Sequence, residues 1–193
     1  MELPSRTLGI AFSDGDRTSH VAGAVVTADG VLDGLGFERC TVGGTDATDA
    51  VVNLWTTLGR EDVSHVACAG IAPAWFNLLD LHRLHETLDR PIFAVSYEAS
   101  SGLEPALRDA FDGGELADRL DTYRSLPPRV RVTDTESDAS GGNSLFVRAI
   151  GFDDTRAVAT VRGLVREGFR RPEPLRIAAV AASAHREALE AKA

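Results

Sequence analysis

The segment His20–Val42, HVAGAVVTADGVLDGLGFERCTV, decides the fold class of this 193-residue chain. It consists of two apolar runs, His20–Thr27 and Val31–Val42, joined around the pair Asp29-Gly30. An Asp-Gly pair between two strand-like runs is a strong signal for a β-hairpin. A third apolar run, Thr7–Phe12, precedes them across the polar turn SDGDRTS. The sequence therefore predicts three antiparallel strands at the start of the chain.

Helical and strand-like segments alternate after this hairpin. The stretch GGTDATDAVVNLWTTL has its apolar residues on one helical face, and Thr45 or Asp46 can cap that helix. The segments that follow are a strand Val63–Ala69, a helix Asn77–Leu88, a strand Pro91–Ser96, short helices in GLEPALRDAF and ELADRLDTYRSL, a hairpin with a polar loop between Thr133 and Ser144, and helices Asp153–Arg166 and Pro174–Ala191. This order predicts an α/β fold with a mixed central sheet and flanking helices, for which the ribonuclease H-like arrangement is one candidate among several. Since no repeat or long linker divides the chain, we expect one domain over residues 1–193.

The composition favours a cytoplasmic protein. No window approaches the about 18 uncharged apolar residues of a membrane span, and the N-terminal residues do not resemble a secretory signal. The two cysteines, Cys40 and Cys68, lie in separate strand-like runs. Buried free thiols are therefore expected rather than a disulfide or a metal site.

The charge balance bears on possible partners. Asp and Glu number 29 against 20 basic residues, and Lys192 is the only lysine. An acidic chain almost without lysine favours a halophilic source, the alternative being an ordinary acidic protein from a GC-rich genome. At about molar salt the Debye length is about 3 Å, so the net charge of −9 does not exclude nucleic acid. Any such binding would then depend on shape and stacking more than on phosphate contacts.

Three segments together resemble one family: GGTDATDAVVNL, GIAPAWFNLLDLHRL with PIFAVS, and RPEPLRIAAVAASA. They are similar to the archaeal endonuclease dU family, a relative of endonuclease V, over Leu8 to about His185. The resemblance implies a ribonuclease H-like, endonuclease V-like domain and a cut in DNA that carries a deaminated base such as uracil or inosine. It also implies a dependence on Mg²⁺ or Mn²⁺ held by carboxylates.

Several positions depart from that family's pattern. The family has Asp-Asp after Gly-Ile in the first strand, where this chain has Ala11-Phe12. It has Asp-Gly before the Thr-rich helix, where this chain has Gly43-Gly44, and Asp at the position of Ala69. Three positions that could hold a metal ion therefore lack a carboxylate.

The remaining acids offer a rearranged set of catalytic residues. We predict Asp14, Asp46 and Glu173 as catalytic, with Asp14 and Asp46 as metal ligands. The alternatives are a solvated acidic turn for Asp14, a helix cap for Asp46, and an ion pair or cap for Glu173. Glu98, at the end of a predicted strand, is a weaker candidate for the missing acid.

The substrate-binding candidates cluster at the junction ACAGIAPAWFNLLDL. Trp75 and Phe76 could stack an unpaired base, or they could be core residues. Asn77 and Asp80 share a face at a predicted helix start, where helix capping is the alternative to contact with substrate. Arg176, near the start of the last helix, could bind a phosphate, with an ion pair to Glu173 as the alternative.

Two main hypotheses follow. The first is a metal-dependent DNA endonuclease that acts on deaminated bases in DNA repair. The second is a catalytically degenerate nucleic-acid-binding or regulatory module of the same fold. A small-molecule hydrolase that uses the same pocket is a third, weaker alternative.

Overall fold

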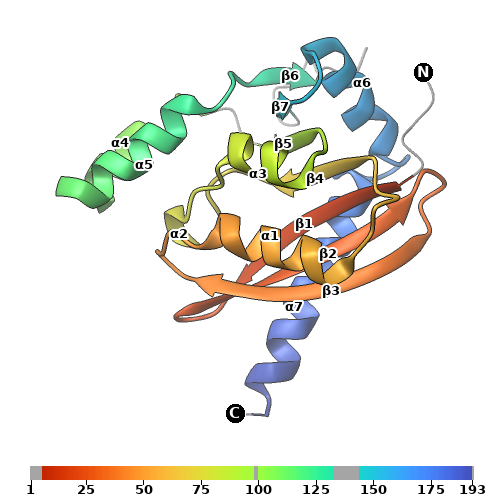
Figure 1. Ribbon diagram of the computed structural model, residues 1–193, viewed down its shortest axis with the longest axis horizontal. Coiled ribbons are helices and arrows are strands. Elements are labelled where there is room, and N and C mark those ends of the chain that lie inside the picture. Colours follow the sequence, from red (N-terminus) through yellow and green to blue (C-terminus); the bar gives the residue numbers. More distant parts are fainter. Residues whose placement is uncertain (1–5, 98–99, 133–143, 193) are drawn as a thin grey trace.

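A seven-stranded mixed sheet runs through the described part of this computed structural model, residues 6–97, 100–132 and 144–192 (Figure 1). Its strand order is β3-β2-β1-β4-β5-β7-β6. The strands are β1 (Arg6–Asp14), β2 (Thr18–Thr27), β3 (Leu32–Thr41), β4 (His65–Ala69), β5 (Ile92–Ser96), β6 (Val130–Val132) and β7 (Leu145–Ile150). The predicted mixed sheet with an antiparallel start is confirmed.

The first three strands form the predicted meander. β1 pairs with β2 and β2 with β3, both antiparallel. At the hairpin turn, the N–H of Gly30 donates to the carbonyl of Thr27 at 2.8 Å, and Gly30 has a φ of +84°. That left-handed backbone suits glycine, which has no Cβ to clash, so the Asp29-Gly30 signal identified the turn correctly.

β4 and β5 add to the sheet in parallel with β1, whereas β7 pairs antiparallel with β5, and β6 pairs antiparallel with β7. Because β1, β4 and β5 are parallel, their carboxyl ends meet at one edge of the sheet. The chain leaves this edge at Asp14, after Ala69 and after Ser96.

Helices cover both faces of the sheet (Figure 1). The helices are α1 (Ala47–Leu58), α2 (Pro73–Phe76), α3 (Leu81–Leu88), α4 (Glu104–Ala110), α5 (Gly113–Ser125), α6 (Asp154–Leu164) and α7 (Glu173–Glu190). α1 and α3 pack with Leu8 and Ile10 on one face. On the other face, α7 packs against the alternate β1 residue Ala11, and α6 packs beside it. A Cβ on Gly9 would lie 2.3 Å from the carbonyl oxygen of Pro174, so this glycine permits the close approach of α7.

The predicted helix Asn77–Leu88 is wrong at its start. α3 begins at Leu81, because the Asp80 carboxylate accepts the N–H of Arg83 at 3.0 Å and so caps the helix there. The predicted loop between Thr133 and Ser144 lies almost entirely outside the described residues, as does Glu98. The other predicted helices and strands are present, with ends that shift by a few residues.

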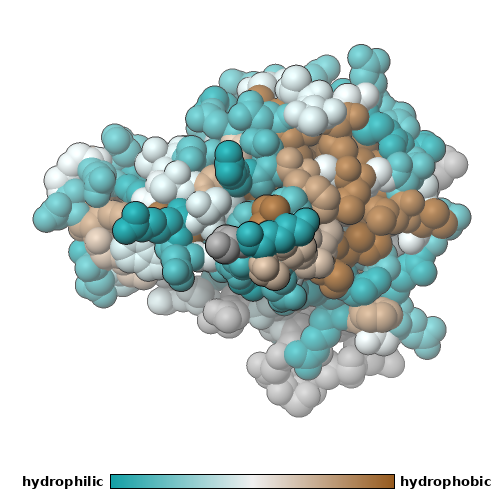
Figure 2. Space-filling model, turned by 90° about the horizontal axis from the view of Figure 1, so that it is seen from below, coloured by the Kyte–Doolittle hydropathy of each residue, from teal (hydrophilic) through white to brown (hydrophobic). Residues whose placement is uncertain are grey.

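One face of the molecule carries an apolar region. Figure 2 shows hydrophobic residues concentrated on one side of the face seen from below. The exposed large apolar residues of β3 and the turn before it are Val31, Leu32 and Leu35. In the described residues, no helix combines the length and the apolar character needed to cross a membrane.

Candidate nucleic-acid interface

The chain makes a strained turn after β4. Ala74, Trp75 and Phe76 have φ angles of 49°, 52° and 62°, in the left-handed region. Non-glycine residues in this region cost about 1–3 kcal/mol each, and such conformations persist only where the surroundings enforce them. The turn exposes 54% of Trp75 at the carboxyl edge of the sheet.

Asn77 anchors one side of this turn. Its side chain is fully buried, and its Oδ1 accepts the N–H of Ala47 at 2.9 Å. Its Nδ2 donates to the carbonyl of Thr41 at 2.8 Å and to the carboxylate of Asp46 at 2.7 Å. Asn77 therefore caps α1 from outside that helix and ties the turn to the end of β3. The structure places this predicted substrate-binding residue beneath the surface.

Arg119 of α5 anchors the other side. Its guanidinium donates to the carbonyls of Phe76 at 3.1 Å, Gly43 at 2.8 Å and Gly44 at 3.1 Å. Only 4% of the residue is exposed, and no carboxylate pairs with it among the described residues. It also lies 3.8 Å from the centroid of the Phe111 ring. Arg119 thus supports both the strained turn and the aromatic residues above it.

Three aromatic rings form a platform at this edge, namely Trp75, Phe76 and Phe111. The Trp75 ring centroid lies 5.6 Å from that of Phe76 and 5.2 Å from that of Phe111. The indole covers Gly43, where a Cβ would come within 2.8 Å of its Cε3 atom. Half of the indole surface thus stays open to a stacking partner while the ring is held from behind.

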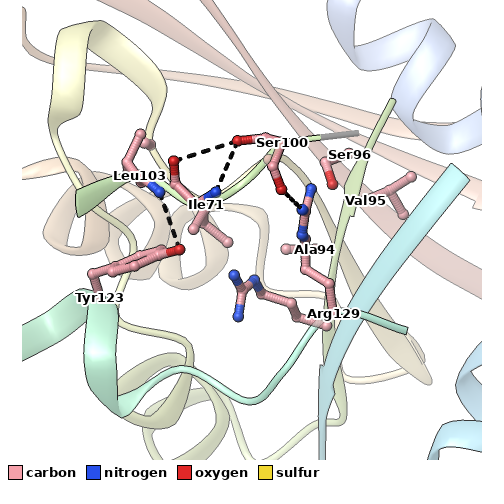
Figure 3. A pocket seen from close by; sticks show the side chains of 12 residues that line it. Ile71, Ala94, Val95, Ser96, Ser100, Leu103, Tyr123 and Arg129 are labelled. Carbon is pink, nitrogen blue, oxygen red and sulfur yellow. Dashed lines mark hydrogen bonds between the residues drawn. The ribbon is translucent and has the colours of Figure 1, made fainter. Parts of the chain in front are cut away.

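Figure 3 shows a cavity of about 350 Å³. It lies on the face that carries α1 and α3, since its residues Ala94 and Ile71 pack in the same cluster as those helices. Its residues Leu103 and Tyr123 share a second cluster with Phe76 and Phe111 of the platform. We call it the β4–β5 cavity. Apolar side chains of Ile71, Val95 and Leu103 line it, and Ser96, Ser100, Tyr123, Arg129 and Arg148 supply its polar groups. The Tyr123 hydroxyl is held by the N–H of Leu103 at 3.1 Å, which Figure 3 marks. This combination of an apolar lining and a few polar groups is typical of a small-ligand site.

Arg148 is the most informative of these polar groups. It projects from β7, its guanidinium carbon lies 5.6 Å from the Tyr123 ring centroid, and it donates a hydrogen bond to the carbonyl of Pro127. Partial burial lowers the pKa of its guanidinium. Within the described residues no carboxylate forms an ion pair with it. A partly desolvated, donor-only group therefore borders the cavity.

Asp14 and Asp46 lie on this same face of the sheet. Asp14 pairs in register with Ser19, and Ser19 pairs with Cys40 on β3. The Ser19 hydroxyl donates to Asp14 at 2.6 Å. Burial, together with the nearby carboxylates of Asp46 and Asp14, raises the pKa of the Cys40 thiol to about 12. The negative charges of both acids therefore favour the protonated form of one buried thiol, that of Cys40.

The Asp46 carboxylate turns back toward β3 and does not cap α1. It accepts the N–H of Thr41 at 3.0 Å, the Thr41 hydroxyl at 2.9 Å and the Asn77 amide. The predicted side-chain cap is thus replaced by the amide of Asn77. Burial works to raise the pKa of Asp46, but the hydrogen bonds from Thr41 and Asn77 outweigh it and hold the pKa below its usual range.

This lowered pKa predicts a specific pH dependence. Because the folded state favours ionised Asp46, its contribution to stability is present above about pH 4 and is lost as the pH falls through the lower folded pKa. We expect Asp46→Asn to flatten the acid limb of the curve of unfolding free energy against pH. Urea unfolding followed by circular dichroism at several pH values measures this, with Asp16→Asn as a control in the β1–β2 turn. An unchanged acid limb in Asp46→Asn would contradict the assignment.

Glu173 and Arg176 lie elsewhere, on the face covered by α7. Arg176 donates two hydrogen bonds to the Glu173 carboxylate, at 2.8 and 2.7 Å, which lowers the pKa of Glu173. The structure therefore does not bring Glu173 together with Asp14 and Asp46. The ion pair that the sequence offered as an alternative is present.

The residues at the expected metal positions do not fit a divalent cation. Ala11 and Ala69 pack with Ala178 of α7 in a small apolar cluster, and Ala11 is 2% exposed. A hard cation such as Mg²⁺ requires oxygen ligands, which these methyl groups cannot supply. In the described ranges, no group of three or more His, Cys, Asp and Glu residues is arranged to hold a metal ion.

Sequence reasoning missed most residues that build the interface. Phe111, Arg119, Tyr123 and Arg148 carried no local motif. Arg119 lies 76 residues from Gly43 in the chain, so only the tertiary fold brings them together. The one sequence signal was compositional, since these arginines follow the acidic first half of the chain.

Comparisons with known proteins agree with this fold. A family model described as Endonuclease dU matches residues 4–186. A UPF0215 protein of Pyrobaculum aerophilum is 31% identical, with 93% of this chain and 92% of that protein covered. A protein of unknown function from Archaeoglobus fulgidus has a TM-score of 0.80 at 24% identity, with 93% of this chain and 96% of that chain covered.

Endonuclease V has a similar fold. The endonuclease V of Ciona intestinalis, solved in complex with a DNA that contains an inosine followed by a ribo-adenosine, has a TM-score of 0.62 at 12% identity. That match covers 96% of this chain and 87% of the other. The fold is therefore ribonuclease H-like, and together with the family match it supports a nuclease-like role. The chain belongs to the endonuclease dU family.

Proposed function

We infer that this protein binds DNA in which one deaminated base has turned out of the stack. The observation that carries this proposal is an exposed indole on a strained turn that begins directly after Ala72, in the wall of a cavity of about 350 Å³. A base that leaves a duplex pays an unstacking cost of a few kcal/mol. Stacking on the Trp75 ring offsets part of this cost, because base–aromatic stacking contributes about 1–3 kcal/mol.

The chemistry of the cavity favours a deaminated base such as uracil or hypoxanthine. Deamination replaces an exocyclic amino group, which donates hydrogen bonds, with an oxygen that accepts them. The guanidinium of Arg148 only donates, so it matches the oxygen and leaves an amino group unpaired. A hydrogen-bond donor left unpaired in a partly dry site costs binding free energy. The cavity would therefore bind the deaminated base more tightly than its parent base, which keeps the amino group.

Within this site, each residue has a distinct part in binding. Trp75 stacks against a base, and Ile71, Val95 and Leu103 exclude water from the extruded base. Arg148 donates toward its oxygen, while Asn77 and Arg119 position the turn without touching substrate. We assign no bond-breaking step, because Ala11 and Ala69 supply no metal ligand.

Metal-dependent cleavage is the second candidate function. The favourable observation is that Asp14 and Asp46 lie on the cavity's face of the sheet, both near enough to Cys40 to raise the pKa of its thiol. This pair would be the ligands of a Mg²⁺ or Mn²⁺ ion, as the sequence predicted. The separation of Glu173 from the pair and the alanines at the sheet edge favour binding without cleavage.

Replacement of Trp75 tests the binding proposal. We expect Trp75→Ala to weaken binding to a uracil- or inosine-containing duplex by about tenfold or more, since stacking is lost. Fluorescence anisotropy with a labelled duplex measures this, at about 0.2 M and about 2 M KCl to separate stacking from screened phosphate contacts. Phe169→Ala is the matched control, because Phe169 is a half-exposed aromatic next to Arg176 on the opposite face. Equal losses in the two variants would overturn the proposed interface.

The same duplex distinguishes the two candidates. Incubation with Mg²⁺ or Mn²⁺ is expected to leave it intact, with binding unchanged by a chelator. Cleavage that disappears in both Asp14→Asn and Asp46→Asn would instead establish the endonuclease. Asp80→Asn is unsuitable as a control, since Asp80 caps α3, whereas Asp16→Asn changes the same charge in the neighbouring turn.

A further inference from the structure

A second cavity of about 350 Å³ lies on the other face of the sheet, next to α7. We call it the α7-side cavity. It shares Gly70, Val95 and Ser96 with the β4–β5 cavity. The two cavities therefore meet at the carboxyl ends of β4 and β5, one from each face of the sheet.

At Gly70, which lines both cavities, no side chain separates one cavity from the other. A Cβ built there would have no heavy atom within 4 Å, so the space above this residue is open. Gly70 also has a left-handed backbone, with a φ of +83°, and its N–H donates to the carbonyl of Val95 at 2.9 Å. A strand that crosses from one cavity to the other at Gly70 therefore meets open space at this residue.

The floor of the α7-side cavity is apolar. It consists of Ala69, Val95, Leu175 and Ala179. Two residues with hydrogen-bonding groups, Tyr97 and Arg171, stand beside this floor, with the Arg171 guanidinium carbon 5.3 Å from the Tyr97 ring centroid. An apolar floor with a cation at its rim suits a sugar or base with an attached phosphate.

Arg171 is available for such an anion. The residue is exposed, and within the described residues its guanidinium forms neither an ion pair nor a hydrogen bond. Most other arginines near α7 are already engaged: Arg176 pairs with Glu173, and Arg186 pairs with Glu190. A guanidinium without a carboxylate partner binds phosphate well, because its N–H groups match two phosphate oxygens at once.

Tyr97 adds an unused hydrogen-bond donor. Its hydroxyl is buried, and no partner reaches it in the part of the chain described. Burial raises the pKa of this hydroxyl to about 12, and the nearby Arg171 opposes that rise only in part, so the group stays protonated and can donate. Buried polar groups normally have partners, so this unpaired hydroxyl points to a ligand oxygen as its acceptor.

We propose that the α7-side cavity binds the nucleotide adjacent to the extruded one on the same strand, with Arg171 on its phosphate and Tyr97 donating to one of its oxygens. This inference rests on the proposed function and adds a second contact point for the strand. Arg171 then supplies positive charge next to Ala69, at the sheet edge that lacks metal-binding carboxylates.

Arg171→Gln and its neighbour Arg170→Gln form a matched pair for the test. Both remove one exposed positive charge, but only Arg171 borders the cavity. In anisotropy titrations with a labelled uracil-containing oligonucleotide, we expect Arg171→Gln to weaken binding about tenfold and to reduce the salt slope by about one. Arg170→Gln is expected to weaken binding less than twofold. Equal effects of the two variants would overturn the site, because charge alone would then explain them.

Tyr97→Phe gives a signature that a purely structural role would not produce. Since the hydroxyl has no partner in the free protein, its removal is expected to leave the melting temperature unchanged or to raise it. Binding of the oligonucleotide should nevertheless weaken by about three- to tenfold. A lowered melting temperature with unchanged binding would contradict the proposal.

A free nucleotide is the other source of the same chemistry. We expect deoxyuridine monophosphate to compete for the site at least about a hundredfold more weakly than the oligonucleotide, since it makes only part of the contacts. Competition at equal concentration that is lost in Arg171→Gln would assign the cavity to a free mononucleotide and overturn the strand path.

The two proposals fail separately: if Trp75→Ala weakens binding while Arg171→Gln and Tyr97→Phe do not, the second site alone is rejected. If the native protein binds no oligonucleotide, the proposed function itself is rejected.

Discussion

Replacement of Asn77 by Ala is expected to lower the free energy of unfolding by about 3 kcal/mol. The side chain is fully buried and makes three hydrogen bonds, to Ala47, Thr41 and Asp46. Its loss leaves the first N–H of α1 and the carbonyl of Thr41 without partners in a site closed to water. The same loss frees the turn that presents Trp75, so DNA binding should weaken together with stability.

Urea unfolding followed by circular dichroism measures this effect. Asn53→Ala is the matched control, because Asn53 is exposed on α1 and alanine is the better helix former, so a change close to zero is expected. A loss in Asn77→Ala of less than about 0.5 kcal/mol would show that water replaces the amide and that the turn does not depend on it.

Asn77→Asp adds a test with a defined sign. The new carboxylate would face Asp46, which now receives the Asn77 amide at 2.7 Å. Repulsion between the two acids raises the pKa of the pair in the folded state, so the folded state binds protons more readily than the unfolded state. The variant should therefore lose stability as the pH rises through this range, opposite to the contribution of Asp46 in the native protein.

Replacement of Arg119 by Met is expected to have a similar effect, about 3 kcal/mol, for a different reason. Methionine retains the apolar stem but cannot donate to the carbonyls of Phe76, Gly43 and Gly44. Each buried carbonyl left unpaired costs about 1–3 kcal/mol, partly offset by relief of the buried charge. Contact with the Phe111 ring is also lost, which weakens the aromatic platform from below.

The fluorescence of Trp75 reports on the turn directly. In a Trp55→Phe background, which leaves Trp75 as the only tryptophan, we expect the emission of the Arg119→Met variant to shift to longer wavelength as the indole becomes more solvated. Arg124→Met on the same helix is the control, since that exposed arginine forms an ion pair with Glu104 and should contribute less than about 1 kcal/mol. Equal stability losses in the two variants would mean that Arg119 is not the support of the turn.

The fold was largely predictable from local patterns. Asp29-Gly30 identified the β2–β3 hairpin because the left-handed backbone at Gly30 has a narrow choice of residues. Apolar runs at Val63–Ala69 and Pro91–Ser96 identified buried parallel strands, and helix periodicity identified α1. These signals are short-range, so one sequence is enough to detect them.

The site was predictable only in part. The junction after β4 followed from the sequence and its family resemblance, whereas the sequence left open whether Trp75 is exposed or part of the core. The role of Asn77 did not follow from the sequence, because its side chain caps α1, 30 residues away, rather than its own helix. Glu173 was grouped with Asp14 and Asp46, but alternation along β1 and the packing of α7 put it on the opposite face.

By itself, the sequence determined the order of strands and helices, the free thiols and the loss of carboxylates at Ala11 and Ala69. Only the tertiary structure decided which groups converge on the sheet edge. The strained turn at Ala74–Phe76, its support by Arg119 and the two cavities that meet at Gly70 all depend on contacts between residues far apart in the chain. Local propensity is a property of neighbouring residues. Strained backbone is tolerated, and arginine side chains are positioned, only by the packing that the chain acquires when it folds.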